Sequence, residues 1–340
     1  MSARLDNNQM MDFTVAINKI PRAWSLLSSM SIAETVGVTT ENVSVDVITE
    51  KTNVFGDAPR GAHRQYVGAE NVITKNLVIP FFPLDGVVTP QDINSLRKFG
   101  TENDLETMTG AVDRVATRIR RYHSALREKA IVEALRGKAY SPNGTTEVYD
   151  YYTVFNQTAN KKEIAFDLAN TATDPIKKAE EAYRHIIDNA DDGAAAYELV
   201  CLASPEFMDG LLSNDTYQQA YLYFESMQNP LRERQNGGSI SRQFKYGSTR
   251  FIEHAGTFNG VRLIPANEAF FFPMGIDDMF KVYHGPADHI DYINTVGQEA
   301  YLWIHPDPKG RRVDVESETA ILAVNHHPEL VVRCTGAASF

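Results

Sequence analysis

The pattern of apolar and polar residues predicts an extended hairpin near the start of the chain. In residues 42–48 (NVSVDVI), valines alternate with Ser44 and Asp46, which predicts a half-buried strand. A polar stretch with several glycine and proline residues follows, and NLVIPFF at 76–82 predicts a second strand. Because a hairpin with so long a connection has little core of its own, we expect it to rest on another subunit.

A sequence pattern typical of a long helix follows the predicted hairpin. Residues 103–136 contain no proline and a single glycine, Gly110, and lie between Gly100 and Gly137, which predicts one long helix. Its apolar residues step by three and four positions over only about three heptads, so we expect it to lie along its own domain rather than in a free coiled coil. The residues of this stripe are Leu105, Met108, Val112, Val115, Ile119, Tyr122 and Leu126.

Basic residues occupy the other side of this predicted helix. They are Arg114, Arg118, Arg120, Arg121, Arg127 and Lys129. Two interpretations remain open: the row is a solvated face, or it docks against acidic groups of a neighbouring subunit.

The segments around the hairpin and helix predict an arm and a strand pair. Residues 1–35 mix short apolar runs with polar breaks, which predicts an arm with a short helix at 24–30 that lies on another surface. Residues 145–156 (TTEVYDYYTVFN) are aromatic and β-branched and predict a strand pair, with a turn at 141–144.

From about residue 165 helices and strands alternate, which predicts a mixed α/β unit. Asp174 caps a predicted helix at 174–189, YELVCLAS predicts a buried strand, and Pro205 opens another helix. The remaining predictions are a helix at 216–228, a mobile loop at 232–244, strands at 249–256 and 261–272, and a strand-rich tail at 300–334 that completes the sheet beside the long helix.

Composition narrows the class of protein. The 340 residues are 43% hydrophobic, enough for one large or two medium cores. Neither a membrane span nor a signal peptide is evident. The formal charge of −11 argues against a protein that binds nucleic acid over its whole surface. Cys201 and Cys334 lie in strand-like apolar runs, where we expect buried thiols in a reducing compartment.

Candidate chemistry is sparse. His284, Asp288, His289 and Asp291, then His326 and His327, are the densest potential ligands, but none has the HExxH spacing of a zinc site. The Gly237–Gly238 pair lacks the lysine of a phosphate-binding loop, and no serine lies in a GxSxG turn. We therefore expect no catalytic residues, no metal and no cofactor, and favour an assembly protein over an enzyme.

The order of these elements resembles the major capsid proteins of lambda-type tailed phages, the phage capsid protein E family, which share the Hong Kong-97-like shell fold. Five stretches carry the resemblance across nearly the whole chain: VSVDVITEKTNVFGDAPRG, LDGVVTPQDI, EALRGKAYSPNG, VRLIPANEAFFFPMGIDDMFKVYHGPAD and LAVNHHPELVVRC. The resemblance implies an α+β chain with an amino-terminal arm at 1–35, an extended β-hairpin loop at 36–88, a peripheral domain at 89–165 and 292–340 with a spine helix at about 103–136, and an α/β axial domain at 166–291.

It further implies a structural protein that assembles into hexamers and pentamers of an icosahedral head around double-stranded DNA, with residues 235–239 near the capsomer centres. The implied partners are other copies, the portal protein, scaffold and decoration proteins, and non-specifically the packaged DNA, but no membrane. We expect a virion component assembled in the host cytoplasm. We expect five arginines to meet carboxylates of neighbouring subunits: Arg60, Arg64, Arg114, Arg118 and Arg121.

Three other readings remain open. An encapsulin-like compartment would have the same fold with a cargo enzyme inside. A cytoplasmic α/β enzyme would use an unrecognised site among His284, Asp288 and His289. A tail or decoration protein is the least favoured, since those seldom combine a long helix with a separate α/β domain.

Overall fold

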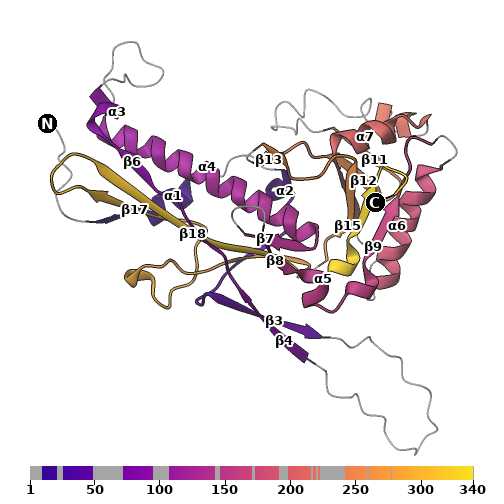
Figure 1. Cartoon of the computed structure of the whole chain (residues 1–340), viewed down its shortest axis with the longest axis horizontal. Helices are drawn as coiled ribbons and strands as arrows, with labels where there is room; N and C mark the ends of the chain where they lie inside the picture. Colours follow the sequence, from indigo (N-terminus) through magenta and orange to yellow (C-terminus); the bar gives the residue numbers. More distant parts are fainter. Residues whose placement is uncertain are drawn as a thin grey trace, which may run out of the picture.

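A computed structural model describes most of the chain (Figure 1). The described residues are 10–20, 26–48, 72–94, 107–141, 146–170, 173–190, 198–215, 217–219, 221–222, 242–258, 260–276 and 278–339. Within them the strands form a seven-stranded sheet, a six-stranded sheet and three two-stranded ribbons. Figure 1 shows the two large sheets at opposite ends of an elongated molecule, joined by the long helix α4. The predicted α+β class is confirmed.

The seven-stranded sheet is organised around one long strand, β18 (Val313–Asn325), which lies beneath α4 (Met108–Leu135). Its path runs β1-β17-β18-β16-β2, and β5 and β6 also pair with β18. The other strands of this sheet are β1 (Met11–Asp12), β2 (Glu34–Gly37), β5 (Phe81–Pro83), β6 (Gly86–Val88), β16 (Phe280–His284) and β17 (Tyr301–Pro306).

The predicted long helix is confirmed, and its ends have local causes. Thr107 precedes the first turn, and its hydroxyl accepts from the Gly110 N–H at 3.1 Å, which satisfies one of the unpaired amides of a helix start. At the other end Gly137 has a φ of +76°, the left-handed geometry that ends helices and favours glycine. Residues 103–106 of the predicted helix lie outside the described residues.

The six-stranded sheet follows the order β11-β12-β10-β15-β19-β9 and carries helices on its flanks. Asp174 caps α6 (Pro175–Asn189) and Pro205 opens α7 (Pro205–Leu212), both as predicted, and the Ser204 hydroxyl caps α7. The strands are β9 (Lys162–Ala165), β10 (Glu198–Ala203), β11 (Gln243–Tyr246), β12 (Thr249–Glu253), β15 (Glu268–Met274) and β19 (Val332–Thr335).

The predicted tail divides between the two sheets. Strands β17 and β18 complete the sheet beside α4 as expected, but β19 pairs with β15 and β9 of the six-stranded sheet. The short turn η4 (Pro328–Leu330) connects β18 to β19. Cys201 in β10 and Cys334 in β19 lie on the two strands that flank β15. Both are free and buried as predicted, and burial raises the pKa of both thiols.

The predicted hairpin is present as β3 (Asn42–Ile48) paired antiparallel with β4 (Val72–Val78), and Figure 1 shows it projecting from the body. The second strand begins earlier than predicted and is broken: β4 ends at Val78, and Pro80 separates it from β5. Proline lacks the N–H that a continuing ladder would need. Residues 49–71, which join the strands, lie outside the described residues.

The predicted strand pair at 145–156 is partly wrong. Strand β8 (Glu147–Asp150) pairs with β7 (Lys138–Tyr140), but the aromatic residues after it form a helical turn, α5 (Tyr151–Val154). The Asp150 carboxylate accepts from the Tyr152 N–H at 3.0 Å and caps this turn, so a local cap overrides the β propensity of the tyrosines. The predicted turn at 141–144 lies between β7 and β8, mostly outside the described residues.

The remaining elements are short. They are α1 (Thr14–Lys19), α2 (Leu26–Ser29), α3 (Pro90–Asn94), β13 (Thr257–Phe258), β14 (Val261–Arg262), η1 (Thr158–Asn160) and η3 (Ile290–Tyr292). Of the helix predicted at 216–228, residues 217–219 and 221–222 are helical and the rest is not described. In the described part of the chain, no helix is long and apolar enough to cross a membrane.

Candidate assembly surfaces

The outward face of α4 carries the described members of the predicted interface. Arg114, Arg118 and Arg121 are exposed there, spaced four and three residues apart, so they form one row on the helix. Arg60 and Arg64 lie outside the described residues. Tyr122, expected in the apolar stripe, is 56% exposed and lies on this same outward face beside Arg118 and Arg121.

Three other basic residues predicted for this face are buried instead. Arg120, Arg127 and Lys129 are 5%, 6% and 8% exposed, so the prediction of one continuous basic face is wrong for them. The reason is that α4 has neighbours on several sides, since α1, α2, β6 and β18 all contact it. Lys129 pairs with Glu133 at 3.4 Å and lies 5.2 Å from the centre of the Phe258 ring.

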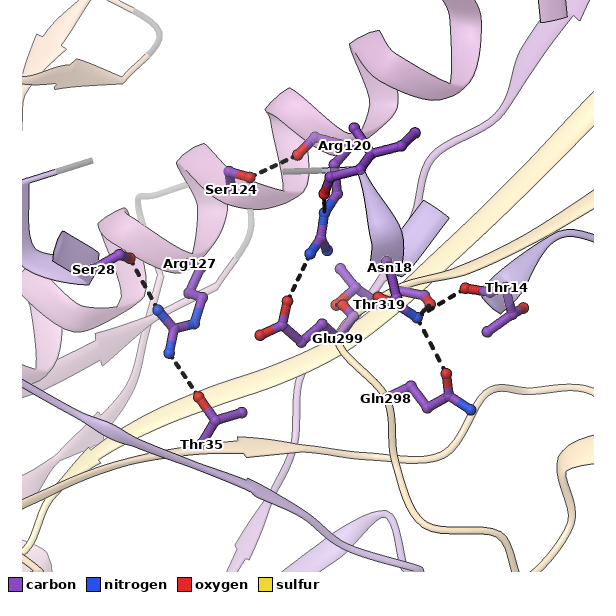
Figure 2. Close-up of polar contacts among 12 residues, drawn as sticks. Thr14, Asn18, Ser28, Thr35, Arg120, Ser124, Arg127, Gln298, Glu299 and Thr319 are labelled. Carbon is purple, nitrogen blue, oxygen red and sulfur yellow. Dashed lines mark hydrogen bonds and ion pairs between the residues drawn. The ribbon is translucent and has the colours of Figure 1, made fainter. Parts of the chain in front are cut away.

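The two buried arginines connect α4 to the rest of the body (Figure 2). The Arg120 guanidinium forms an ion pair with Glu299 at 2.8 Å and donates to the Ile20 carbonyl at 3.4 Å. The Arg127 guanidinium donates to the hydroxyls of Ser28 and Thr35 at 2.9 and 2.8 Å. Buried guanidinium groups need such fixed acceptors, so these contacts determine how α4 lies on the sheet.

The first described residues are held by the same region, which changes the predicted arm. The Asn18 amide donates to the Thr14 carbonyl at 3.0 Å, to the Gln298 side chain at 3.1 Å and to the Ala300 carbonyl at 2.9 Å (Figure 2). Thr14 and Ile17 are fully buried, and β1 pairs with β17. The surface on which residues 10–20 lie is therefore the seven-stranded sheet of their own chain.

Glu128 joins three parts of the chain at one buried point. Its carboxylate accepts from the Leu27 N–H of α2 at 3.0 Å and lies 3.6 Å from the His254 ring nitrogen at the end of β12. Both side chains are less than a tenth exposed. The junction ties the long helix to the six-stranded sheet and to the amino-terminal segment.

The base of the β3–β4 hairpin is anchored in the core. Val43, Val45, Leu77 and Ile79 are each 5% exposed or less. The opposite face is polar, with Ser44 donating to Asn76 at 2.7 Å and Thr74 to Asp46 at 2.6 Å. One face thus fixes the root of the hairpin to the body while the strands extend beyond it.

Two histidines, the buried His123 and the half-buried His326, should make the fold sensitive to acid. Burial, helped by nearby Arg120, lowers the pKa of His123 to about 4. Burial, helped by Lys281 and His327, lowers the pKa of His326 to about 4 as well. The ordinary pKa of both histidines is 6.5, so between pH 6.5 and pH 4 the unfolded chain binds more protons than the folded chain. The stabilisation is complete above pH 6.5 and is lost as the pH falls toward 4.

Replacing His326 by asparagine should therefore flatten the pH dependence. We expect the fall in unfolding free energy between pH 7 and 4.5, followed by urea denaturation of the unassembled chain, to shrink by about 2 kcal/mol. His305→Asn, at a position whose side chain is 33% exposed, is the control and should keep the full fall. Equal pH dependence in wild type and His326→Asn would contradict this account.

The histidine positions considered for metal binding do not converge. His284 lies buried in β16, His289 lies against Trp303, and His326 bonds to the Tyr283 hydroxyl at 3.2 Å. In the ranges that the structure describes, no three His, Cys, Asp or Glu side chains form a group that could hold a metal ion.

Comparison with sequence families and curated proteins gives concordant results. The family model described as phage major capsid protein E matches residues 9–335. The major capsid protein of Pseudomonas phage KPP10 is 33% identical over 344 residues, covering 97% of each chain. The major capsid protein of Salmonella phage Felix O1 is 24% identical over 352 residues, covering 94% of each chain.

Solved structures give the same fold. A putative capsid protein of a prophage from E. coli CFT073 superposes with a TM-score of 0.60 at 13% identity, covering 96% of this chain and 99% of the other. The capsid of Ralstonia phage GP4 superposes with a TM-score of 0.55 at 13% identity, covering 93% and 95%. The predicted Hong Kong-97-like fold class is thereby confirmed.

Proposed function

The chain belongs to the phage major capsid protein E family, a family of structural proteins and not of enzymes, and we propose that its copies assemble as hexamers and pentamers into an icosahedral head around double-stranded DNA. The observation that carries this proposal is the β3–β4 hairpin, whose buried root is fixed in the chain's own core while its strands project from the body (Figure 1). A two-stranded ribbon is marginal alone and becomes stable on another surface. In a shell, that surface is the adjacent copy.

The two sheets support a division into the regions expected of a capsid subunit. We assign residues 1–35 to the arm, 36–88 to the extended loop, 89–165 and 292–340 to the peripheral domain, and 166–291 to the axial domain. Helix α4 and β18 support the peripheral assignment, and the sheet around β10 supports the axial one. Three strands are exceptions to these bounds. By its pairing β16 belongs to the peripheral sheet although it lies within 166–291, and β9 and β19 belong to the axial sheet although they lie within 89–165 and 292–340.

The exposed arginines of α4 are proposed to contact carboxylates of a neighbour, as are Arg60 and Arg64. Reversing charge with Arg118→Glu and Arg121→Glu should reduce the assembled fraction at least tenfold, since like charges across a contact repel. Sedimentation of expressed chain measures this fraction. Lys177→Glu on α6, where the side chain is 82% exposed, is the control and should assemble normally. Undiminished assembly of the double variant would exclude these arginines from the contact.

Further partners follow from the proposed role. We propose contacts with the portal protein and with scaffold and decoration proteins, and assembly in the host cytoplasm; as a phage capsid protein, the chain is a virion component. The formal charge of −11 supports a wall along which packaged DNA moves without adhering. The tip at 235–239, proposed to lie at the capsomer centres, falls outside the described residues.

An encapsulin-like compartment has the same type of fold, so the fold does not separate it from a phage head. Both curated relatives come from phages, which favours the head. The contents of purified particles distinguish the two: DNA after co-expression with the phage packaging proteins supports the head, and a cargo enzyme supports the compartment.

Mass measurement tests the proposal. Light scattering of the chain, expressed alone and with the other head proteins of its phage, should give at least five or six times the chain mass of 38.0 kDa. A 38.0 kDa species under every one of these conditions would contradict it.

A further inference from the structure

The chain between β16 and β17 crosses one face of the seven-stranded sheet, and we call its residues 286–296 the strap. Two of its rings lie against β17. The His289 ring stacks on Trp303 with centres 4.9 Å apart, and the Tyr292 ring lies edge-on to Tyr301 at 4.8 Å. These ring contacts hold the strap against the sheet.

The strap and α4 lie on opposite faces of this sheet. Ser317 in β18 bonds to His123 of α4 at 2.8 Å, while the next residue, Glu318, accepts from the Asp288 N–H of the strap at 3.1 Å. Alternate residues of a strand point to opposite faces. The strap therefore belongs to the face of the sheet that α4 does not cover.

The outer side of the strap is apolar. Ile290, Ile293 and Val296 are 82%, 65% and 60% exposed. Single exposed apolar residues are ordinary on a protein surface, but three on one short segment that is packed on a sheet form a patch. Patches of this kind mark interaction surfaces.

Carboxylates border this patch. Asp288 and Asp291 are exposed beside the isoleucines, and Glu318 lies next to Asp288. Burial raises the pKa of Glu318, the hydrogen bond from the Asp288 N–H lowers it, and the carboxylates of Asp288 and Asp85 raise it. A cation arriving from outside would relieve this repulsion between carboxylates. The patch thus fits a partner that combines positive charge with some apolar surface.

The turn that joins β17 to β18 has this composition. Its exposed residues, which we call the tip, are Pro308, Lys309, Gly310, Arg311 and Arg312. Within the described residues the side chains of Lys309 and Arg311 form no ion pair or hydrogen bond, whereas Arg312 pairs with Asp314 at 3.1 Å. Pro308 and the aliphatic stems of the long basic side chains supply apolar surface.

The tip is closed by its own hydrogen bonds. The Gly310 N–H donates to the Asp307 carbonyl at 2.8 Å, and the Asp307 N–H donates to the Arg312 carbonyl at 3.0 Å. Pro308 occupies the second position of this turn, where proline is favoured, and Gly310 has a φ of +66°, the left-handed region that favours glycine. A turn ordered in this way loses little conformational freedom on docking.

The tip of one copy does not reach the strap of the same copy. The strap packs on Trp303, and from there to Lys309 the chain extends roughly 15 to 20 Å at about 3.3 Å per residue. Figure 1 shows the turn between β17 and β18 at the end of the molecule away from the six-stranded sheet. Two complementary surfaces at separate places on one chain make a head-to-tail contact between copies, which closes into a ring when the rotation permits.

We propose that the tip of one copy docks on the strap of a copy in the adjacent capsomer, with Lys309 and Arg311 facing Asp288 and Asp291, and with Pro308 covering the exposed isoleucines. This inference rests on the proposed self-assembly, in which the six-stranded sheet lies toward the capsomer centre. The tip, at the other end of the molecule, then points to the next capsomer. The contact therefore joins capsomers to each other.

A charge swap tests the pairing. Asp288→Lys with Asp291→Lys, or Lys309→Glu with Arg311→Glu, should each lower the fraction of chain in closed shells at least tenfold in sedimentation, because like charges then meet across the contact. Light scattering should find these variants as separate capsomers. The chain with all four changes regains opposite charges and should form shells to within threefold of wild type.

Matched controls separate the contact from general effects of charge and polarity. Lys177→Glu with Arg184→Glu reverses two cations on α6, whose side chains are 82% and 74% exposed, and should leave shell formation unchanged. Ile290→Ser with Ile293→Ser should lower shell formation, whereas Val261→Ser, at a 70% exposed valine on β14, should not.

Urea denaturation of each unassembled variant identifies any that misfold, and for those Asp288→Asn with Asp291→Asn replaces the lysine pair and should still lower shell formation. Folded strap variants that form shells like wild type would overturn the inference. Normal shells from the tip variants would also overturn it, since another occupant would then hold the strap, as would a folded four-residue swap without shells. Failure of the wild type itself to assemble would instead count against the proposed function.

Discussion

Replacing Phe251 by alanine is expected to lower the free energy of unfolding by about 4 kcal/mol, the largest single effect predicted here. The Phe251 ring in β12 is fully buried and stacks on Phe244 with centres 4.8 Å apart. The rings of Tyr217 and Phe271 meet it edge-on at 5.5 and 5.9 Å. Alanine would remove the shared partner of all three rings and leave a cavity in a close-packed core.

Urea denaturation of the unassembled chain measures this loss. Phe251→Leu, which keeps most of the buried volume, is the matched control and should cost about 1 to 1.5 kcal/mol. If the alanine and leucine variants lost the same small amount, the aromatic cluster would not be the packed centre of the six-stranded sheet.

Replacing Arg120 by alanine should lower the free energy of unfolding by about 3 kcal/mol, although the exposed Arg118 and Arg121 lie close to it in the sequence of α4. Its guanidinium is nearly buried and is the ion-pair partner of Glu299, whose side chain is 19% exposed. Removing it leaves a largely buried carboxylate without its counter-charge and the Ile20 carbonyl without its donor.

Arg118 offers a control two residues away. It is exposed on the outward face of α4, so Arg118→Ala should change the stability of the isolated chain by less than about 0.5 kcal/mol. In assembly the order should be reversed. If Arg118 contacts a neighbouring copy, Arg118→Ala should lower the assembled fraction more than Arg120→Ala does. Equal stability losses at both positions would contradict the distinction between a buried connecting arginine and an exposed docking arginine.

Elements with a clear local cause were predictable from sequence. The alternation at 42–48 and the caps at Asp174 and Ser204, each followed by proline, act within a few residues, and the structure places β3, α6 and α7 there. The long helix was predictable because residues 103–136 contain no proline and a single glycine.

The buried side of α4 was harder to predict because a second row of buried residues, which includes arginines, lies beside the apolar stripe. Arg120 and Arg127 lie in step with buried Ala116 and Ile131, at spacings of three and four through His123. That periodicity was a usable signal for a second buried face, but charge alone suggested solvent. The partners that neutralise these arginines, including Glu299, are distant in sequence, and no local pattern identifies them.

The remaining features depend on pairing between residues that are distant in sequence, so no local pattern predicts them. Whether β19 continues beside α4 or enters the sheet with β15 depends on the turn at η4, not on the strand's own composition. For the predicted interface, exposure of Arg114, Arg118 and Arg121 follows from helical spacing, but the carboxylates that we propose as their partners lie on another copy.

Cryo-electron microscopy of particles assembled from this chain tests the central claim most directly. The account predicts closed icosahedral shells of hexamers and pentamers, in which the β3–β4 hairpin of each copy lies across an adjacent copy. Closed shells in which every hairpin folds back on its own chain, or discrete small oligomers without shells in the presence of the other head proteins, would contradict it.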